Sequence, residues 1–399
     1  MKGFLFVILF TLLTAVCWGI YGPVLQTGQF ALRESIFDAP GRWRAFICVG
    51  LAYFVIAILV PMIWLQLNGE KGNWTSSGFL WSFIAGIGGA LGALGIVLAF
   101  TFGGKPIYVM PLVFGVAPVV NTFTTMYMNK TLKEVGPMFL AGLILVIMGA
   151  VTVLFFKPAE PKVTFSDVKV NDEKAPLKER KISLMFTKTE ADGKKETLPI
   201  TDMTLPEMVE KKGVYLEAAK AYLAKTGGAM STFNWIMVVA SIALTGISWG
   251  VYGPTLHKGQ FAMNGSRLRP FLCVGLAYLV IAVVVPFALL GWLEPNGAFN
   301  FNGTSWSLGG GAVGAIGALG VIMAFNFGGK PIFVMPLIFG LAPVINSFVE
   351  LFRSNLLGEI GPLFYAGLLL VIGGAVTVLL FAPRAKPHGP APTSVPAKA

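Results

Sequence analysis

The chain has 399 residues, of which 55% are hydrophobic and only 12% are charged. Because an ordinary soluble domain carries about a quarter charged residues, this composition excludes a chain folded around one water-soluble core. The net charge of +11 would suit a nucleic-acid binder, but residues 157 to 232 hold 14 Lys or Arg against 12 Asp or Glu, and the other cations are scattered over short loops and the tail. We therefore expect no nucleic-acid partner.

Ten apolar runs approach the length of about 20 helical residues that crosses a ~30 Å hydrocarbon layer. They cover residues 4 to 25, 46 to 66, 79 to 102, 106 to 128, 137 to 156, 234 to 256, 271 to 292, 306 to 327, 331 to 352 and 362 to 382. This pattern predicts an all-α polytopic membrane protein. Its parts are a first five-helix repeat (1–157), a hydrophilic connector (158–232), a second five-helix repeat (233–382) and a disordered Pro-rich tail (383–399). The start, with Lys2 before an apolar stretch, is similar to a secretory signal, but the same pattern recurs as the sixth run, so we expect a membrane helix there.

The two halves are copies of one another. Residues 46 to 156 align with 271 to 381 without a gap at an offset of 225, and 61 of these 111 positions are identical. Upstream the offset is 231, because the first loop is six residues longer in the first half. Since each half has an odd number of spans, the second half should be inverted relative to the first, as in many secondary transporters.

Aromatic residues near the end of the first run of each half are candidates for a cavity. Trp18 and Tyr21 precede Gly22 and Pro23, and the second half repeats this pattern with Trp249, Tyr252, Gly253 and Pro254. We expect the Gly-Pro pairs to break the helix, so that unwound backbone lines a cavity. The aromatics could then stack on a ring and bond it through an O–H or N–H; the alternative is an interfacial aromatic belt.

Glycines and a lysine mark the third and fourth runs. Gly86, Gly89, Gly92 and Gly95 recur at every third residue, as do their counterparts in the second half, which favours close helix packing over a sliding surface. A helix break is expected between these runs at Gly103, Gly104, Lys105 and Pro106, and in the second half at Gly328, Gly329, Lys330 and Pro331. Each lysine either reaches the interface or contacts an anion or a gate.

Other polar residues inside the runs are few. Asn121 and Asn346 need hydrogen-bond partners in apolar surroundings, either as contacts between helices or to a substrate. Glu350 is the one carboxylate within a run, and neither His257 nor His388 is in a suitable place for proton transfer. The three cysteines have no metal-ligand spacing, and no nucleophile with a base or Walker loop is present. We expect no enzyme activity, no metal and no cofactor.

The connector favours a loosely ordered linker, with a small appended domain or partner-binding arm as the alternative. It should end in one amphipathic helix that is capped by Thr204 and stops at Gly227 and Gly228. Tyr215, Ala218, Ala219 and Tyr222 would share one face of this helix.

The chain resembles the drug/metabolite transporter superfamily. The motifs that carry the resemblance are repeated in both halves: Trp18 and Gly19 (Trp249 and Gly250), Pro111 and Pro118 (Pro336 and Pro343), and Leu132, Glu134, Gly136, Gly142 and Gly149 (Leu357, Glu359, Gly361, Gly367 and Gly374). The segment from Gly19 to Gly28 and the long connector are similar to the sugar-porter and ureide-permease side of that superfamily, whose nucleotide-loop-like motif is missing here. The resemblance implies ten helices in two inverted halves and a carrier activity. The membrane glutamate of cationic-drug exporters is absent from the first run, which disfavours a proton-coupled cation exporter.

Together these features predict a secondary transporter of a small polar metabolite, sugar- or nucleobase-like, that works by alternating access. The alternatives are a membrane scaffold or sensor whose connector binds a partner, and a lipid-handling protein. Besides the substrate, we expect contacts with membrane lipids, and a homodimer is left open. Loop charges favour cytoplasmic termini in a bacterial inner membrane. The candidate substrate-binding residues are Trp18, Tyr21, Lys105, Asn121, Trp249, Tyr252, Lys330 and Asn346.

Overall fold

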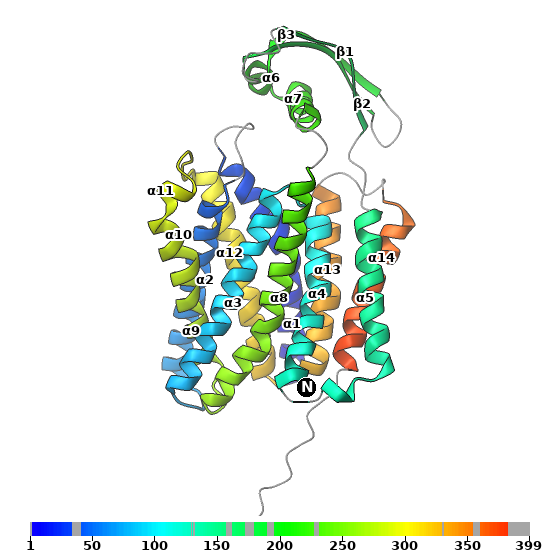
Figure 1. Cartoon of the computed structure of the whole chain (residues 1–399). Helices are drawn as coiled ribbons and strands as arrows, with labels where there is room; N and C mark the ends of the chain where they lie inside the picture. The colour runs from blue at the N-terminus through cyan, green and yellow to red at the C-terminus, as the bar shows by residue number, and fades with distance from the viewer. Residues whose placement is uncertain are drawn as a thin grey trace, which may run out of the picture.

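The structure is a computed structural model of the whole chain. It describes residues 2–33, 41–128, 130, 132–156, 162–171, 179–189, 195–226, 231–328, 331–353 and 360–381. Helices run side by side in one bundle, and a small domain made by the connector lies beyond one end of it (Figure 1). We call this the connector end. The opposite end, where the first helix starts, is called the N-terminal end.

All ten predicted segments are helical. The first half comprises α1 (Lys2–Ala31), α2 (Trp43–Asn68), α3 (Ser76–Thr101), α4 (Pro106–Met128), a short 3₁₀ turn (Leu132–Glu134) and α5 (Pro137–Phe155). The second half comprises α8 (Thr232–Ala262), α9 (Leu268–Tyr278), a π-helical turn (Leu279–Val284), α10 (Val285–Ala288), α11 (Leu290–Leu293), α12 (Phe301–Asn326), α13 (Pro331–Arg353) and α14 (Pro362–Leu380). The run predicted at 271 to 292 is therefore not one regular helix, unlike its counterpart α2.

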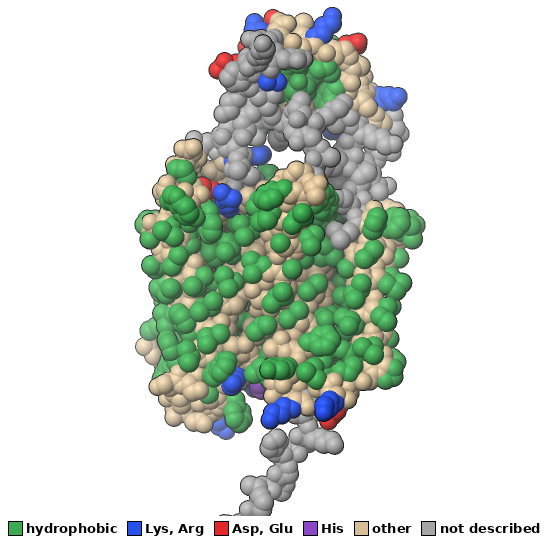
Figure 2. Space-filling view, viewed as in Figure 1, with side chains coloured by type: hydrophobic (Ala, Val, Ile, Leu, Met, Phe, Trp, Pro, Cys, Tyr) green, Lys and Arg blue, Asp and Glu red, His purple; other side chains and the backbone are tan. Residues whose placement is uncertain are grey.

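The bundle has the surface of a membrane protein. Within the described residues, seven helical stretches are long and apolar enough to cross a membrane, and α5 and α14 contain shorter apolar stretches. Hydrophobic side chains cover the flank of the bundle, whereas Lys, Arg, Asp and Glu gather near its ends and on the connector domain (Figure 2). The prediction of a helical polytopic integral membrane protein is confirmed.

Corresponding helices of the two halves make corresponding contacts. Helix α1 packs on α12 and α13, and its counterpart α8 packs on α3 and α4; α5 and α14 pack on each other. The glycines make the closest approaches possible, since a methyl group on Gly92 would lie within 3.0 Å of the Trp249 indole, and one on Gly317 equally close to Trp18. The periodic glycines therefore act in packing, where missing side chains let helix backbones approach in lipid.

The expected helix breaks at the Gly-Pro pairs are absent. Helix α1 continues through Gly22 and Pro23, and α8 continues through Gly253 and Pro254. A proline inside a transmembrane helix is tolerated where neighbouring helices pack around it. Here Gly22 lies against Met110 of α4, so this glycine admits a neighbour and does not unwind the chain.

The turns between α3 and α4 and between α12 and α13 do end their helices. Gly103 and Gly328 have φ angles of +93° and +97°, which favour glycine, and α4 begins at Pro106 as α13 begins at Pro331. Proline suits a first helical position, because its missing N–H would be unpaired there anyway. Gly329 and Lys330 lie outside the described residues.

Each half caps a helix of the other half with a glutamate. The Glu294 carboxylate accepts backbone N–H bonds from Arg42 (3.0 Å) and Arg44 (3.1 Å) at the start of α2, and it pairs with the Arg44 guanidinium at 3.1 Å. In the same way, Glu70 accepts the backbone N–H of Arg267 at 2.8 Å at the start of α9. An anion at a helix N-terminus is favourable, so these contacts tie the two halves together.

The connector forms a folded domain, where the sequence favoured a loose linker. Its strands β1 (Lys162–Asn171), β2 (Lys181–Thr189) and β3 (Lys195–Thr204) make an antiparallel sheet in the order β1-β2-β3. Alternate residues of β2, namely Ile182, Leu184 and Phe186, are buried against two helices. The domain thus has a hydrophobic core of its own. In the sequence, the alternation of apolar residues in β2 was too short a signal to outweigh the many charged residues around it.

The predicted single helix of the connector is two helices, α6 (Leu205–Lys211) and α7 (Gly213–Thr226). They separate at Lys212, whose φ angle is +58°. Ala218, Ala219 and Tyr222 of α7 are buried in the domain core, as the amphipathic pattern indicated. Gly227 and Gly228 lie outside the described residues.

Replacing Gly92 or Gly317 with Ala should destabilise the bundle by about 1–3 kcal/mol, because the new methyl group has to displace an indole ring. Gly373→Ala in α14 is the matched control: an added Cβ there meets nothing within 4 Å. Alanine favours a helix over glycine by about 1 kcal/mol, so this control should be neutral or stabilising. Thermal unfolding of the purified variants in detergent checks both; an unchanged midpoint for Gly92→Ala contradicts the packing role.

Thr204→Ala should loosen α6. The Glu207 carboxylate accepts the Thr204 backbone N–H at 2.7 Å, and the Thr204 hydroxyl accepts the Glu207 N–H at 3.4 Å. The backbone bond holds the pKa of Glu207 below its usual value. A lowered pKa means that this stabilisation is present above the ordinary carboxyl pKa and is lost as the pH falls through the lowered value. Near neutral pH, loss of a cap worth ~1 kcal/mol should speed amide exchange in 205–211 several-fold relative to exchange in α7.

Candidate functional site

A cavity of about 600 Å³ lies between the two halves, and aromatic rings form its centre. Trp18 and Tyr21 of α1 and their counterparts Trp249 and Tyr252 of α8 all line it. The Tyr21 and Trp249 ring centroids lie 6.2 Å apart. Two sequence-related groups of aromatics, distant along the chain, are thus brought together at one place.

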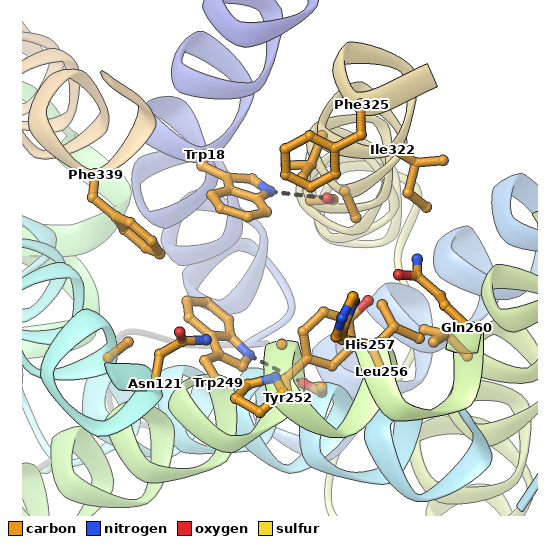
Figure 3. A pocket seen from close by; sticks show the side chains of 18 of the residues that line it. Trp18, Asn121, Trp249, Tyr252, Leu256, His257, Gln260, Ile322, Phe325 and Phe339 are labelled. Atoms are coloured by element: carbon orange, nitrogen blue, oxygen red, sulfur yellow. Dashed lines mark hydrogen bonds between the residues drawn. The ribbon is translucent and has the colours of Figure 1, made fainter. Parts of the chain in front are cut away.

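Both tryptophans line the cavity, and their indole N–H groups are already bonded within the protein. Trp18 Nε1 donates to the Gly314 carbonyl of α12 at 3.3 Å, and Trp249 Nε1 donates to the Gly89 carbonyl of α3 at 3.2 Å. Both bonds are drawn in Figure 3. We expected an indole N–H to be left for a ligand, and the structure differs because each helix meets its partner at a glycine, whose backbone is within reach of the indole.

Two further tyrosines close one wall of the cavity. Tyr53 of α2 and Tyr278 of α9 stack face to face, with centroids 4.0 Å apart and planes 4° apart. Tyr21 lies nearby and is only 3% exposed, and its hydroxyl has no hydrogen-bond partner in the described structure. A buried hydroxyl without a partner is costly unless something bonds it, so Tyr21 is a candidate ligand contact.

Apart from the tyrosines Tyr21, Tyr53 and Tyr278, the polar side chains of the cavity lie on one side. Asn121 and Thr125 come from α4, and His257 and Gln260 from α8, next to Tyr252. The facing wall, from α12 and α13, is apolar; it consists of Ala318, Val321, Ile322, Phe325 and Phe339. Figure 3 shows Asn121 and Tyr252 on the opposite side of the view from Ile322 and Phe325. Among the described lining residues there is no Lys, Arg, Asp or Glu.

The cavity opens toward the N-terminal end of the bundle. Helix α8 starts beside the connector, so His257 and Gln260, near its last residue, lie at the far end (Figure 1). Met128, the last residue of α4, also lines the cavity and is 40% exposed. His257 is exposed as well. These residues form the mouth.

The remaining predicted residues are not brought into this cavity. Asn346 is the counterpart of Asn121, but it is fully buried and its side-chain amide donates to the Pro106 carbonyl at 2.9 Å. Lys105 is exposed in the turn before α4 and is not among the lining residues. Lys330 lies outside the described residues. The cavity therefore uses one asparagine of the pair.

Several lining residues were missed from the sequence, among them Tyr53, Thr125, His257, Gln260 and Tyr278. His257 seemed badly placed, because we expected the helix to end near residue 256, whereas α8 runs to Ala262. Tyr53 and Tyr278 occur at equivalent positions of both halves, inside apolar runs. An aromatic hydroxyl kept in both copies was the signal that could have identified them.

Neither a protein-family model nor a curated protein sequence matches this chain.

Tyr21→Phe should leave the thermal stability of the protein unchanged or higher, because it removes a buried hydroxyl that has no protein partner. Tyr108→Phe is the matched control, since the Tyr108 hydroxyl donates to the Gly103 carbonyl at 3.3 Å. Loss of that bond should cost about 1 kcal/mol. Thermal unfolding distinguishes the two, and a clear loss of stability in Tyr21→Phe would mean that its hydroxyl is part of the protein's own bonding.

Proposed function

We propose that this protein is a secondary carrier of a small, uncharged, polar metabolite and that it works by alternating access. The observation that carries the proposal is the central cavity, which takes corresponding aromatic residues from both halves and whose described lining reaches exposed residues at the N-terminal end. A scaffold gains nothing from such a cavity. Binding sites in carriers with inverted repeats lie near the membrane midplane, between the repeats.

Alternating access is supported by the way corresponding residues make corresponding contacts. Thr14 donates to the Gly317 carbonyl at 3.0 Å, and its counterpart Thr245 donates to the Gly92 carbonyl at 3.1 Å. At the centre the two halves are alike, but Asn121 faces the cavity while Asn346 is buried. We infer ten membrane-spanning segments in two inverted halves, which exchange these two environments during transport.

The distribution of polar groups favours a flat ring with one polar edge. Such a ring could stack on the faces of Trp18 and Trp249 and bond Asn121 or Gln260 along one edge. A sugar carries hydroxyls around its whole rim, and those facing Ile322 would lose their hydrogen bonds at a substantial cost. Of the two predicted classes, nucleobase-like compounds therefore suit this cavity better than sugars. The absence of charged side chains from its described lining favours an uncharged substrate.

The first experiment is a thermal-shift screen of purified protein against nucleobases, ureides, sugars, amino acids and phosphorylated metabolites, because a ligand that binds only the folded state raises its apparent stability. We expect a saturable shift from an uncharged heteroaromatic compound, followed by uptake in proteoliposomes. Uptake that survives alanine at Trp18, Tyr21, Trp249 and Tyr252 together would exclude this cavity as the transport site. No shift from any class would favour the scaffold or lipid-handling alternatives.

Gln260→Ala should weaken binding of the compound found in that screen by about 3- to 10-fold, the effect of losing one neutral hydrogen bond. Its thermal stability without ligand should stay the same, because Gln260 lies at the mouth. The matched control is its counterpart Gln29, which is fully buried and donates to the Val97 carbonyl at 2.9 Å. Gln29→Ala should lower stability. Titration and thermal unfolding of both variants separate the two roles.

A further inference from the structure

An arginine at the end of α13 binds α1 across the connector end of the cavity. Arg353 Nη1 donates to the Pro23 carbonyl at 2.9 Å and to the Thr27 hydroxyl, and its Nη2 donates to Gln26 Oε1 at 2.9 Å. Arg353 Nε also pairs at 3.4 Å with Glu350, whose side chain is 6% exposed. We call these five residues the latch.

The Arg353 side chain is 41% exposed, so solvent screening weakens the latch. It is still the more effective for being charged, because hydrogen bonds from a guanidinium are about twice as strong as bonds between neutral groups. The fork of the guanidinium holds three acceptors of α1 at once, and Glu350 fixes its other edge. The contact lies beyond Asn346 as seen from the cavity centre, one to two helical turns along α13. It thus holds α13 against α1 at the connector end, away from the mouth.

The sequence repeat shows which residues occupy the equivalent positions at the N-terminal end, where the mouth lies. Offsets of 225 and 231 relate Glu350 and Arg353 to Thr125 and Met128, and they relate Gln26 and Thr27 to His257 and Lys258. Methionine has no hydrogen-bond donor, so it cannot bridge to α8 as Arg353 bridges to α1. Met128 lines the open mouth.

Lys258 is also turned toward another helix. Its ammonium lies over the ring of Trp81 of α3, 3.6 Å from the centroid. Thr27, whose hydroxyl accepts a bond from Arg353 at the connector end, thus corresponds to the cationic Lys258 at the N-terminal end. A cation there would repel an arginine that approached from α4.

We propose that the latch is a one-sided lock that biases the carrier toward the state open at the N-terminal end. This rests on the proposed function, since it assumes two states that alternate. Closing the N-terminal end requires the connector end to open, which breaks the Arg353 bonds and forms no equivalent set. Substrate release or capture at the connector end is therefore the step that the latch opposes.

Distances between spin labels test this without any substrate. In a background with Cys17, Cys48 and Cys273 replaced by Ala, one label pair at Phe30 and Phe352 reports on the connector end. The equivalent pair at Phe261 and Tyr127 reports on the N-terminal end. Arg353→Met, which copies the residue of the first half, should lengthen the first distance and shorten the second, with about a tenfold change in the ratio of the two populations. Glu350→Gln should change each distance in the same sense as Arg353→Met does, but by less. Met128→Leu, the matched control, should change neither distance.

A transplant makes the test reciprocal. A fourfold variant rebuilds the latch at the N-terminal end: Thr125→Glu, Met128→Arg, His257→Gln and Lys258→Thr. It should raise the population that is closed at that end. This test does not depend on whether Arg353→Met folds. Distances that stay unchanged in both the Arg353→Met and the transplanted protein overturn the lock. Distances that respond while no compound is bound or transported leave the lock standing and refute the carrier function. The converse result, transport with unresponsive distances, refutes the lock alone.

Discussion

The arrangement of this bundle depends on the close approach of α1 to α12 and of α8 to α3, which is possible because both partners carry glycines where they meet. In lipid the hydrophobic effect does not drive helices together, so packing and hydrogen bonds between helices have to do so. Two of these glycines each admit an indole ring of the opposite helix: Gly317 admits Trp18, and Gly92 admits Trp249. Without these positions α1 and α8 would stand further out, and their aromatic residues would not meet at the centre.

The same contacts shape the cavity. Burial of an indole N–H is costly unless it is bonded. The carbonyls of Gly314 in α12 and Gly89 in α3 supply the acceptors. Because the N–H bond and the glycine at its ring edge both hold each tryptophan, the orientation of the indole is set by the protein itself. A largely preformed, mostly apolar pocket with a few polar groups is the usual form of a small-molecule site. The stacked pair of Tyr53 and Tyr278 adds a rigid wall where α2 and α9 meet.

Most of the helical architecture could be predicted from the sequence, because length and apolar composition are local properties and all ten predicted segments are helical. The aromatic centre was also within reach, since Trp18, Tyr21 and their counterparts recur in both halves. What could not be predicted depends on tertiary contacts. Asn121 and Asn346 follow nearly the same preceding sequence, yet one lines the cavity and the other is buried, because the described cavity extends toward the N-terminal end. The fold of the connector could not be predicted for a different reason. Its core comes from alternate residues of three short strands and from two helices, so the apolar positions are spread over some 40 residues among many charged ones.

The pattern of divergence between the halves follows the cavity axis. Seven of the ten positions in 111–120 are identical to those in 336–345, whereas only two of the next ten are, 121–130 against 346–355. The first block holds Phe114 and Phe339, which lie with centroids 6.3 Å apart at the centre, and the second holds the residues at the two ends of the cavity. In the proposed carrier, a centre shared by both halves would have to fit the same ligand in either state, which restricts both copies alike. The ends meet no such requirement, since each closes against a different stretch of α1 or α8. In the carrier that we propose, differences at the ends would therefore change the relative free energy of its two states without altering the site between them, and this is where it would acquire a preferred direction of opening.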